Sequence, residues 1–500
     1  MNKAPEKPNT EREESGKRAE KKKEKKAKSA RKKTQNKSAA VLTSDFSRIK
    51  YTYKEGSGKR PTAPLRPAAK PPRRLYSPIE ADELKRRAGL TAPTPRNAKT
   101  RRARRSILAP APLPPTVSKN PYRRKIVGFL TELREHLSHL DYITVGLTAA
   151  LSIIGILAVH SATLTKGTSR FDIMQIGMTT VGFGLMLLLS FVDYDSLTKN
   201  FRWVLILNCA MLLFTAIFGT GADGGGDTNH NWVRFGPIGI QPAEIGKILY
   251  IITFASHIDN VKHRINHIKT LFGLMLHAGL VIGLVLLEKD TGQATVYFVI
   301  TAVMLFAARL SLWYFAAAGV AGLSLAPILW QHLDLYQQER ILVGFNPELD
   351  PLYRGYQAIQ SKTAIAAGGL TGLGYRKGLV TQTTLLPAKQ TDMIFAVIGE
   401  EAGFVGAMGT ILLLFGLAAR LFRNAVCADK TAGALICAGV GGMILYQSIE
   451  NIGMCLGLLP VIGITLPFVS YGGSSVLGMY LAMGVALSVY AKNNRLYFGG

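Results

Sequence analysis

Residues 142–163 read YITVGLTAALSIIGILAVHSAT. This stretch contains no Asp, Glu, Lys or Arg, and it is long enough for a helix that crosses a bilayer, which needs about 20 apolar residues. Nine further apolar stretches follow, at 174–192, 202–219, 242–258, 271–287, 292–308, 312–330, 394–421, 432–455 and 474–491. The sequence therefore predicts an all-α polytopic membrane protein with ten transmembrane helices.

The chain of 500 residues divides into two parts of different composition. Residues 1–125 contain 37 of the 60 Lys and Arg residues but only 11 of the 32 Asp and Glu residues, so they carry +26 of the formal net charge of +28. This part offers too little apolar surface to fold, which predicts a disordered basic tail. Residues 126–500 are nearly neutral and apolar, which predicts a membrane domain and excludes a soluble globular enzyme of average composition.

The basic tail lies directly before the first predicted span. Such a position favours binding to anionic lipid and retention in the cytoplasm. A cytoplasmic protein partner is the alternative. Nucleic acid is not the expected partner, because Tyr51, Tyr53 and Tyr76 are scattered and no nucleic-acid-binding module can be recognised.

The bases between the spans predict the orientation of the chain. Lys and Arg concentrate in alternate short loops, and by the positive-inside rule this places both termini in the cytoplasm. The 164–173 loop is the exception, since Lys166 and Arg170 would face outward. The largest outer segment is 331–391, a long extracytoplasmic loop between the seventh and eighth spans.

Charged residues gather at the outer ends of the predicted spans, where charge is costly and by default indicates function. Pro242 fits the first turn of a helix, and Glu244 and Lys247 can pair on one face because they are three residues apart. Asp290 ends a charged turn directly before the sixth span. A purely structural ion pair and an ordinary charged turn are the alternatives.

Asp392 lies where the long outer segment passes into the eighth span. Partial burial at such a border raises the pKa of a carboxyl group toward that of a useful general base. A carboxylate that only complements the helix dipole is the alternative.

Residues 457–475 are apolar and rich in Gly and Pro, so they cannot form a regular helix. We interpret them as a re-entrant segment, which is tolerated in a membrane where protein or a cavity covers its backbone. The hydroxyl groups of this segment, including those of Ser470 and Ser474, could meet a lipid head group or could serve only the structure.

Taken in order, these blocks resemble the SEDS family (shape, elongation, division, sporulation), the RodA/FtsW-type peptidoglycan glycosyltransferases. The matching pieces are Gln241-Pro242-Ala243-Glu244 with Lys247, Asp290-Thr291-Gly292, Arg340-Ile341, Gly355-Tyr356-Gln357, Gly368-Gly369, Leu386-Pro387 to Thr391-Asp392 with Glu400-Glu401, and Leu466-Pro467-Phe468 to Ser474-Ser475. The resemblance covers about 142–495, and the family also has ten spans.

The sequence departs from the family pattern around the aspartate. Ala388, Gln390 and Met393 stand where the family usually has Glu, His and Phe, although Thr391-Asp392 is intact. These changes could alter the electrostatics of Asp392. Other details of the outer segments look closer to the RodA branch than to the FtsW branch.

The resemblance implies an enzyme of the bacterial cytoplasmic membrane that joins lipid II units into glycan strands at its outer face, for cell elongation and shape. It implies that Asp392 is the general base. Lys247 and Arg340 are the expected partners of the diphosphate, followed by Arg234 and Arg354. The expected substrate-binding set is Lys247, Glu244, Arg340, Asp290, Arg234, Ser470 and Ser474.

The resemblance also implies a partner, a class B penicillin-binding protein that crosslinks the new strand. A divalent cation, Mg²⁺ or Mn²⁺, could share the diphosphate near Asp392, Glu244 or Asp290, although no ligand motif identifies its site. Three alternatives remain open: a flippase or transporter of lipid-linked precursors, a division polymerase of the FtsW type, and a catalytically idle scaffold.

Overall fold

The computed structural model describes residues 137–164, 170–221, 230–235, 238–332 and 335–498, together with Glu135. These residues belong to one compact unit. The predicted disordered tail, residues 1–125, lies outside the described residues, so its disorder and its ligands stay predictions.

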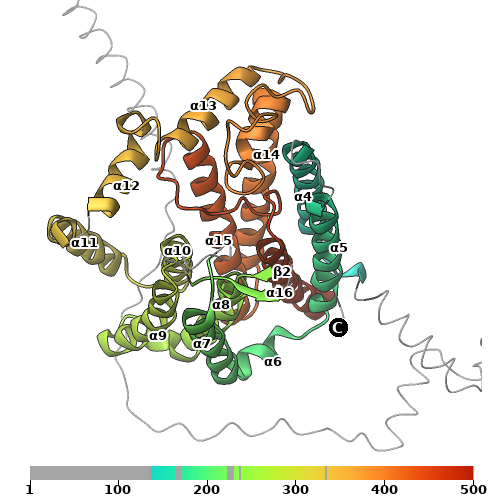
Figure 1. Ribbon diagram of the computed structural model, residues 1–500. Coiled ribbons are helices and arrows are strands. Elements are labelled where there is room, and N and C mark those ends of the chain that lie inside the picture. The colour runs from blue at the N-terminus through green and yellow to red at the C-terminus, as the bar shows by residue number, and fades with distance from the viewer. Residues whose placement is uncertain are drawn as a thin grey trace, which may run out of the picture. The chain divides into compact units, whose positions relative to one another are not determined.

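Helices make up most of the described chain (Figure 1). Those that overlap the ten expected spans are α4 (Tyr142–Thr163), α5 (Arg170–Ser190), α7 (Phe201–Phe218), α8 (Pro242–Val261), α9 (Ile268–Leu287), α10 (Thr291–Ala307), α11 (Leu312–His332), α14 (Ile394–Val426), α15 (Thr431–Cys455) and α16 (Gly473–Phe498). The shorter elements are α6 (Tyr194–Lys199), α12 (Leu335–Phe345), α13 (Tyr356–Gly368), the 3₁₀-helices η2 (Lys262–Arg264) and η3 (Pro347–Leu349), and the strands β1 (Val233–Phe235) and β2 (Ile238–Ile240).

Seven of the helices that the structure describes are long and apolar enough to cross a membrane, namely α4, α5, α7, α9, α14, α15 and α16. Helix α10 and the apolar part of α11, Leu312–Ile328, are shorter. Helix α8 has sufficient length but carries Glu244 and Lys247 in its first two turns. The all-α membrane fold is confirmed, while the count of ten spans stays a prediction.

Local sequence explains where the helices next to the site begin. Pro242 stands at the first position of α8, where its missing N–H costs no hydrogen bond. Asp290 caps α10 by accepting a hydrogen bond from the backbone N–H of Gln293. Both residues belong to the sequence blocks that resemble the family, so these blocks also start helices.

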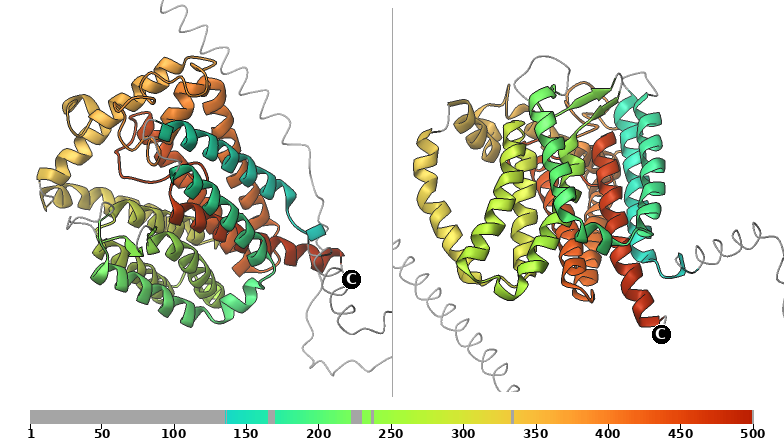
Figure 2. Two further views of the ribbon diagram at one scale, coloured as in Figure 1. Left: turned by 45° about the vertical axis from the view of Figure 1, so that its right-hand side comes forward. Right: turned by 90° about the horizontal axis from the view of Figure 1, so that it is seen from below.

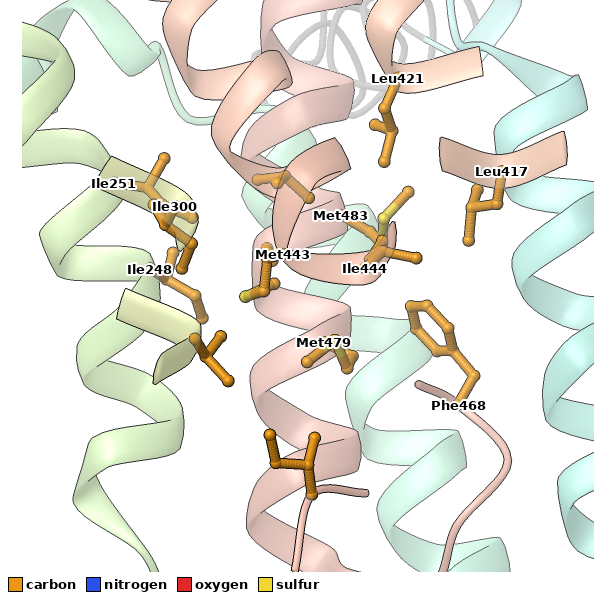
Figure 3. Close-up of a cluster of buried hydrophobic side chains, with 14 of the residues drawn as sticks. Ile248, Ile251, Ile300, Leu417, Leu421, Met443, Ile444, Phe468, Met479 and Met483 are labelled. Carbon is orange, nitrogen blue, oxygen red and sulfur yellow. The ribbon is translucent and has the colours of Figure 1, made fainter. Parts of the chain in front are cut away.

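Helices α15 and α16 form the middle of the bundle (Figure 1). Helix α15 packs against α8, α10 and α14, and α16 packs against α5 and α8. Their shared core contains Ile248, Ile251, Ile300, Leu417, Leu421, Met443, Ile444, Phe468, Met479 and Met483 (Figure 3). Residues of both central helices are therefore mostly buried within the protein, whereas α4, α5, α7 and α9 expose much of their apolar surface.

The bundle has two distinct ends (Figure 2). One end, which we call the hairpin end, carries the β1–β2 hairpin, the start of α8 and of α14, and the irregular segment 456–472 between α15 and α16. The C-terminus lies at the opposite end. The hairpin was not expected from the sequence, because three-residue strands are too short to give a recognisable alternating pattern.

The segment 331–391, which the sequence predicts to be an extracytoplasmic loop, is largely ordered. It contains α12, η3 and α13, followed by a coil that leads to Asp392. The start of this coil packs against a break in α14. The break lies at Gly403, whose φ of 64° is outside the helical region. A Cβ atom at Gly403 would lie 2.3 Å from the backbone nitrogen of Gly372, so the close approach of the two segments requires glycine.

Candidate functional site

The first two turns of α8 carry a buried ion pair. Nζ of Lys247 lies 2.7 Å from Oε2 of Glu244, and neither side chain has more than 1% of its surface exposed. The other carboxylate oxygen, Oε1 of Glu244, accepts a hydrogen bond from Nε2 of Gln293 in α10, at 2.7 Å. Glu244 therefore joins α8 to α10, and neither member of the pair faces the surface.

Asp290 has both carboxylate oxygens occupied. Oδ1 accepts from the backbone N–H of Gln293, while Oδ2 accepts from Nδ2 of Asn231 at 2.8 Å and from Nε2 of Gln241 at 2.7 Å. Ser474, at the start of α16, joins the same network because its Oγ accepts from the backbone N–H of Gln241 at 2.9 Å. The structure thus brings together four residues, Glu244, Lys247, Asp290 and Ser474, from three distant parts of the sequence.

The segment 456–472 connects this network to Asp392. On one side, a Cβ atom at Gly292 would lie 2.6 Å from the carbonyl oxygen of Ile462. On the other side, a Cβ atom at Gly463 would lie 3.7 Å from Oδ2 of Asp392. Gly463 has a φ of 75°, a left-handed backbone conformation that favours glycine.

Three hydrogen bonds hold the backbone around Asp392. Nδ2 of Asn451 in α15 donates to the carbonyl oxygen of Asp392 at 2.8 Å, Oγ of Ser470 donates to that of Thr391 at 2.7 Å, and the N–H of Tyr471 donates to that of Gln390 at 2.8 Å. The same Asn451 amide also donates to Ile464, at 2.8 Å. The main chain on both sides of the carboxylate is therefore fixed to the bundle.

Asp392, taken as a whole residue, is half-buried in this setting. Burial raises its pKa to about 6, against the opposing effect of a hydrogen bond with Thr391. A carboxylate with this pKa is largely ionised at pH 7 yet basic enough to accept a proton during a reaction. The expectation that the membrane border would raise the pKa of Asp392 agrees with this environment.

The coil before Asp392 is braced by Glu400, one of the two glutamates in the first part of α14. The Glu400 carboxylate accepts the backbone N–H groups of Leu379 and Val380, each at 2.7 Å, and that of Thr381 at 2.8 Å. Lys389 reinforces this arrangement from within the coil, because its buried ammonium donates to the carbonyl oxygens of Thr381 and Thr383. Both charges serve the shape of the coil.

Glu401, the second glutamate, connects the same coil to α4. Its Oε1 accepts from Oγ of Ser161 at 2.6 Å and from Nε2 of Gln382 at 2.9 Å. The end of α4 and the start of α5 meet beside this contact, where Nδ1 of His160 lies 3.0 Å from Oδ2 of Asp172.

The expected arginines are not gathered around Asp392 by any contact in the described residues. Arg234 is exposed on β1. Arg354 pairs with Glu339, with Nη1 and Oε2 2.5 Å apart. Arg340 lies in α12, and its side chain is outside the described part of the structure.

Several connecting residues were missed by the sequence analysis. Asn231, Gln241 and Gln293 hold Asp290 and Glu244, and Asn451 holds Asp392. Asn451 had a recognisable signal, since a polar side chain within an apolar span is costly and usually has a definite partner. Gln241 stood next to Pro242 in a quoted block, but the sequence alone cannot tell which residue it would contact.

The side chains named for a divalent cation do not form a metal site in the described residues. No group of three His, Cys, Asp or Glu side chains is placed to hold a metal ion there. Glu244 is paired with Lys247, and the oxygens of Asp290 already accept three hydrogen bonds. Glu244 and Asp290 are thus committed to protein partners, the divalent cation stays a prediction, and no step below depends on it.

Comparisons with known proteins agree on one family. A family model described as "Cell cycle protein", which covers FtsW, RodA and SpoVE, matches residues 141–495. A relative from Geobacter sulfurreducens, "Probable peptidoglycan glycosyltransferase FtsW", is 30% identical over 365 residues, which are 72% of this chain and 97% of the relative.

Two solved structures are similar to the chain. One, described as "Structural coordination of polymerization and crosslinking by a peptidoglycan synthase complex", has a TM-score of 0.60 and 28% identity, and the match covers 71% of this chain and 98% of the other. The other is the Thermus thermophilus rod shape determining protein RodA, with a TM-score of 0.53 and 26% identity over 70% of this chain and 96% of the other.

Proposed function

The chain belongs to the family of FtsW, RodA and SpoVE cell cycle proteins, and on that premise we propose that it is a peptidoglycan glycosyltransferase. Its substrate is lipid II, which it polymerises into glycan strands at the outer face of the bacterial cytoplasmic membrane. The hairpin end of the bundle is the outer end in this proposal, and both termini are cytoplasmic. The apolar helices and the relatives support a multi-pass bacterial membrane protein.

One observation carries the catalytic assignment: the half-buried residue Asp392 lies beside the 456–472 segment, which also packs on Gly292 of another block that resembles the family. In the reaction, the 4-hydroxyl oxygen of an acceptor sugar attacks the anomeric carbon of a donor. Asp392 takes the hydroxyl proton while the new C–O bond forms. The bond between the anomeric carbon and the lipid diphosphate breaks, and the diphosphate leaves with the electron pair.

General-base assistance accounts for about 10²–10⁴ in rate, so the rest must come from positioning and charge stabilisation. Asn451, Ser470 and Tyr471 contribute positioning because they fix the main chain that carries Asp392. Glu244 and Lys247 contribute by holding α8 against α10, next to the segment that packs on Asp392. Arg340 and Arg234 remain proposed partners of the diphosphate.

A class B penicillin-binding protein is the proposed partner. The support is the similar structure described as a peptidoglycan synthase complex that coordinates polymerisation and crosslinking. Both branches of the family are present among the similar proteins, so the preference for elongation over division rests on the sequence details alone.

The test is a polymerisation assay with purified protein and fluorescent lipid II, with and without the partner. Glycan strands made by the wild-type protein and lost in Asp392→Asn support the proposal. Movement of labelled lipid across vesicles without glycan synthesis would instead indicate a flippase. A folded protein that does neither, but binds the partner, would indicate a scaffold.

A further inference from the structure

Lys362 of α13 is an exposed cation beside the segment that packs on Asp392. Its neighbour Ser361 donates from Oγ to the carbonyl oxygen of Cys455 at 2.7 Å. Sγ of Cys455 in turn lies 3.6 Å from the carbonyl oxygen of Asp392. Two contacts therefore connect the helix turn that carries Lys362 with the main chain of Asp392.

The stem of Lys362 lies over Gly457. A Cβ atom at Gly457 would be only 2.7 Å from Cδ of Lys362, and Gly457 has a φ of 64°. Glycine thus meets a backbone requirement and leaves room for the lysine stem. Packing of the stem against main chain limits the conformations of the ammonium group, which reduces the entropy lost when it binds an anion.

The other two lysines near the network are already committed to partners. Lys247 is fully buried against Glu244, and Lys389 is buried against two carbonyl oxygens. Lys362 is exposed and makes no ion pair with any residue in the part of the chain that the structure describes. Its charge is available to a ligand from solution or from the membrane surface.

We propose that Lys362 binds the diphosphate of the lipid-linked donor and stabilises the negative charge that grows on it as the glycosidic bond forms. This inference rests on the proposed function. A departing diphosphate gains negative charge in the transition state. A cation that is already in place therefore stabilises the transition state more than it stabilises the ground state. Lys362 thereby takes the role that the sequence suggested for the enclosed Lys247.

Polymerisation by purified protein tests this with Lys362→Met, which keeps a long apolar stem without the charge. We expect kcat/KM to fall about 10- to 100-fold, with most of the loss in kcat, and Lys362→Arg to recover part of it. Lys377→Met is the matched control, because Lys377 is another exposed lysine of the same outer segment, and it should act as wild type. An unchanged unfolding temperature shows that each variant is folded.

Inhibition by the diphosphate product is a second measurement. It reports how tightly each protein binds the diphosphate, and not only how fast the variant polymerises lipid II. Undecaprenyl diphosphate should inhibit wild type and Lys377→Met at similar concentrations. It should inhibit Lys362→Met about tenfold more weakly, because the loss of a charge-assisted contact of about 1.4 kcal/mol weakens binding by a factor of ten. Added phosphatidylglycerol should not compete.

The inference would be overturned if Lys362→Met had the kcat/KM of wild type and were inhibited by undecaprenyl diphosphate as strongly as wild type. Competition by phosphatidylglycerol would assign Lys362 to ordinary anionic lipid and would overturn it as well. If the wild-type protein makes no glycan, the proposed function fails. If wild type and Lys362→Met polymerise lipid II equally well, only the role of Lys362 fails.

Discussion

The side-chain amide of Asn451 donates a hydrogen bond of 2.8 Å to the backbone oxygen of Asp392. The same amide reaches the backbone oxygen of Ile464 at the same distance. One fully buried side chain of α15 therefore holds the main chain that carries the proposed base and the irregular segment that packs against it. This amide is the one side chain of α15 among the three groups that hold the main chain around Asp392.

Replacing Asn451 by leucine should lower kcat by tenfold or more. Each buried carbonyl left without a donor costs about 1–3 kcal/mol, and the main chain of Asp392 loses its anchor. The matched control is Gln447→Leu, one turn away on α15, because the buried Gln447 amide has no partner among the described residues. Equal rates for the two leucine variants and wild type would contradict the anchoring role.

The activity should rise with pH through about 6. The base must be ionised, and burial raises the pKa of Asp392 to about 6. Below that pH, kcat/KM should fall tenfold per pH unit, as the protonated fraction grows. A profile of kcat/KM between pH 4.5 and 8.5 measures this, provided that the protein stays folded, and a flat profile across pH 6 would argue against Asp392 as the base.

Glu288, between α9 and α10, should make the protein less stable as the pH rises. Its carboxyl group is fully buried without a partner among the described residues, and burial, with a smaller contribution from Asp290, raises its pKa to about 8. In the unfolded state this carboxyl group loses its proton above about pH 4.5, whereas in the folded state it keeps the proton up to about pH 8. The free energy of unfolding therefore falls as the pH rises from about 4.5 to about 8. Glu288→Gln cannot ionise and should remove this loss.

Thermal unfolding in detergent at pH 5.5 and 8.5 checks the prediction for Glu288. The unfolding temperature of Glu288→Gln should change less between the two pH values than that of wild type. The exposed Glu348 provides the control, because Glu348→Gln should behave as wild type at both. The same pH dependence in all three proteins would contradict the assignment.

Glu400→Gln should loosen the coil that leads to Asp392. Glutamine keeps one acceptor oxygen where the carboxylate now serves three backbone N–H groups, and hydrogen bonds to a charged group contribute about 1.5–3 kcal/mol each. Hydrogen exchange of the 379–392 amides should become at least tenfold faster, while the amides of α16 keep their rates. Unchanged protection in 379–392 would show that Glu400 is not the brace.

The sequence predicted the fold well because long apolar runs admit few structures in a membrane. Each expected span overlaps a helix, and the irregular stretch 457–475 is largely non-helical up to the start of α16 at Gly473. The β1–β2 hairpin and the break at Gly403 were not predicted. Both depend on contacts with distant segments, which a local pattern does not contain.

The site was predicted only in part, for a related reason. Spacing showed that Glu244 and Lys247 could pair, and the structure has that pair. Spacing could not show that both side chains would be buried, which turns a candidate ligand of the diphosphate into a structural element. Lys362 carried no local signal, since its place beside Gly457 arises from the packing of α13 on α14 and α15.

The central claim is that the carboxylate of Asp392 removes a proton from the acceptor sugar. The most direct measurement is the initial rate of lipid II polymerisation by purified Asp392→Asn, which keeps the size and the backbone contacts of the residue. The account predicts a rate at least 100-fold below that of wild type at pH 7, with an unchanged unfolding temperature. A folded Asp392→Asn protein that polymerises lipid II at close to the wild-type rate would contradict it.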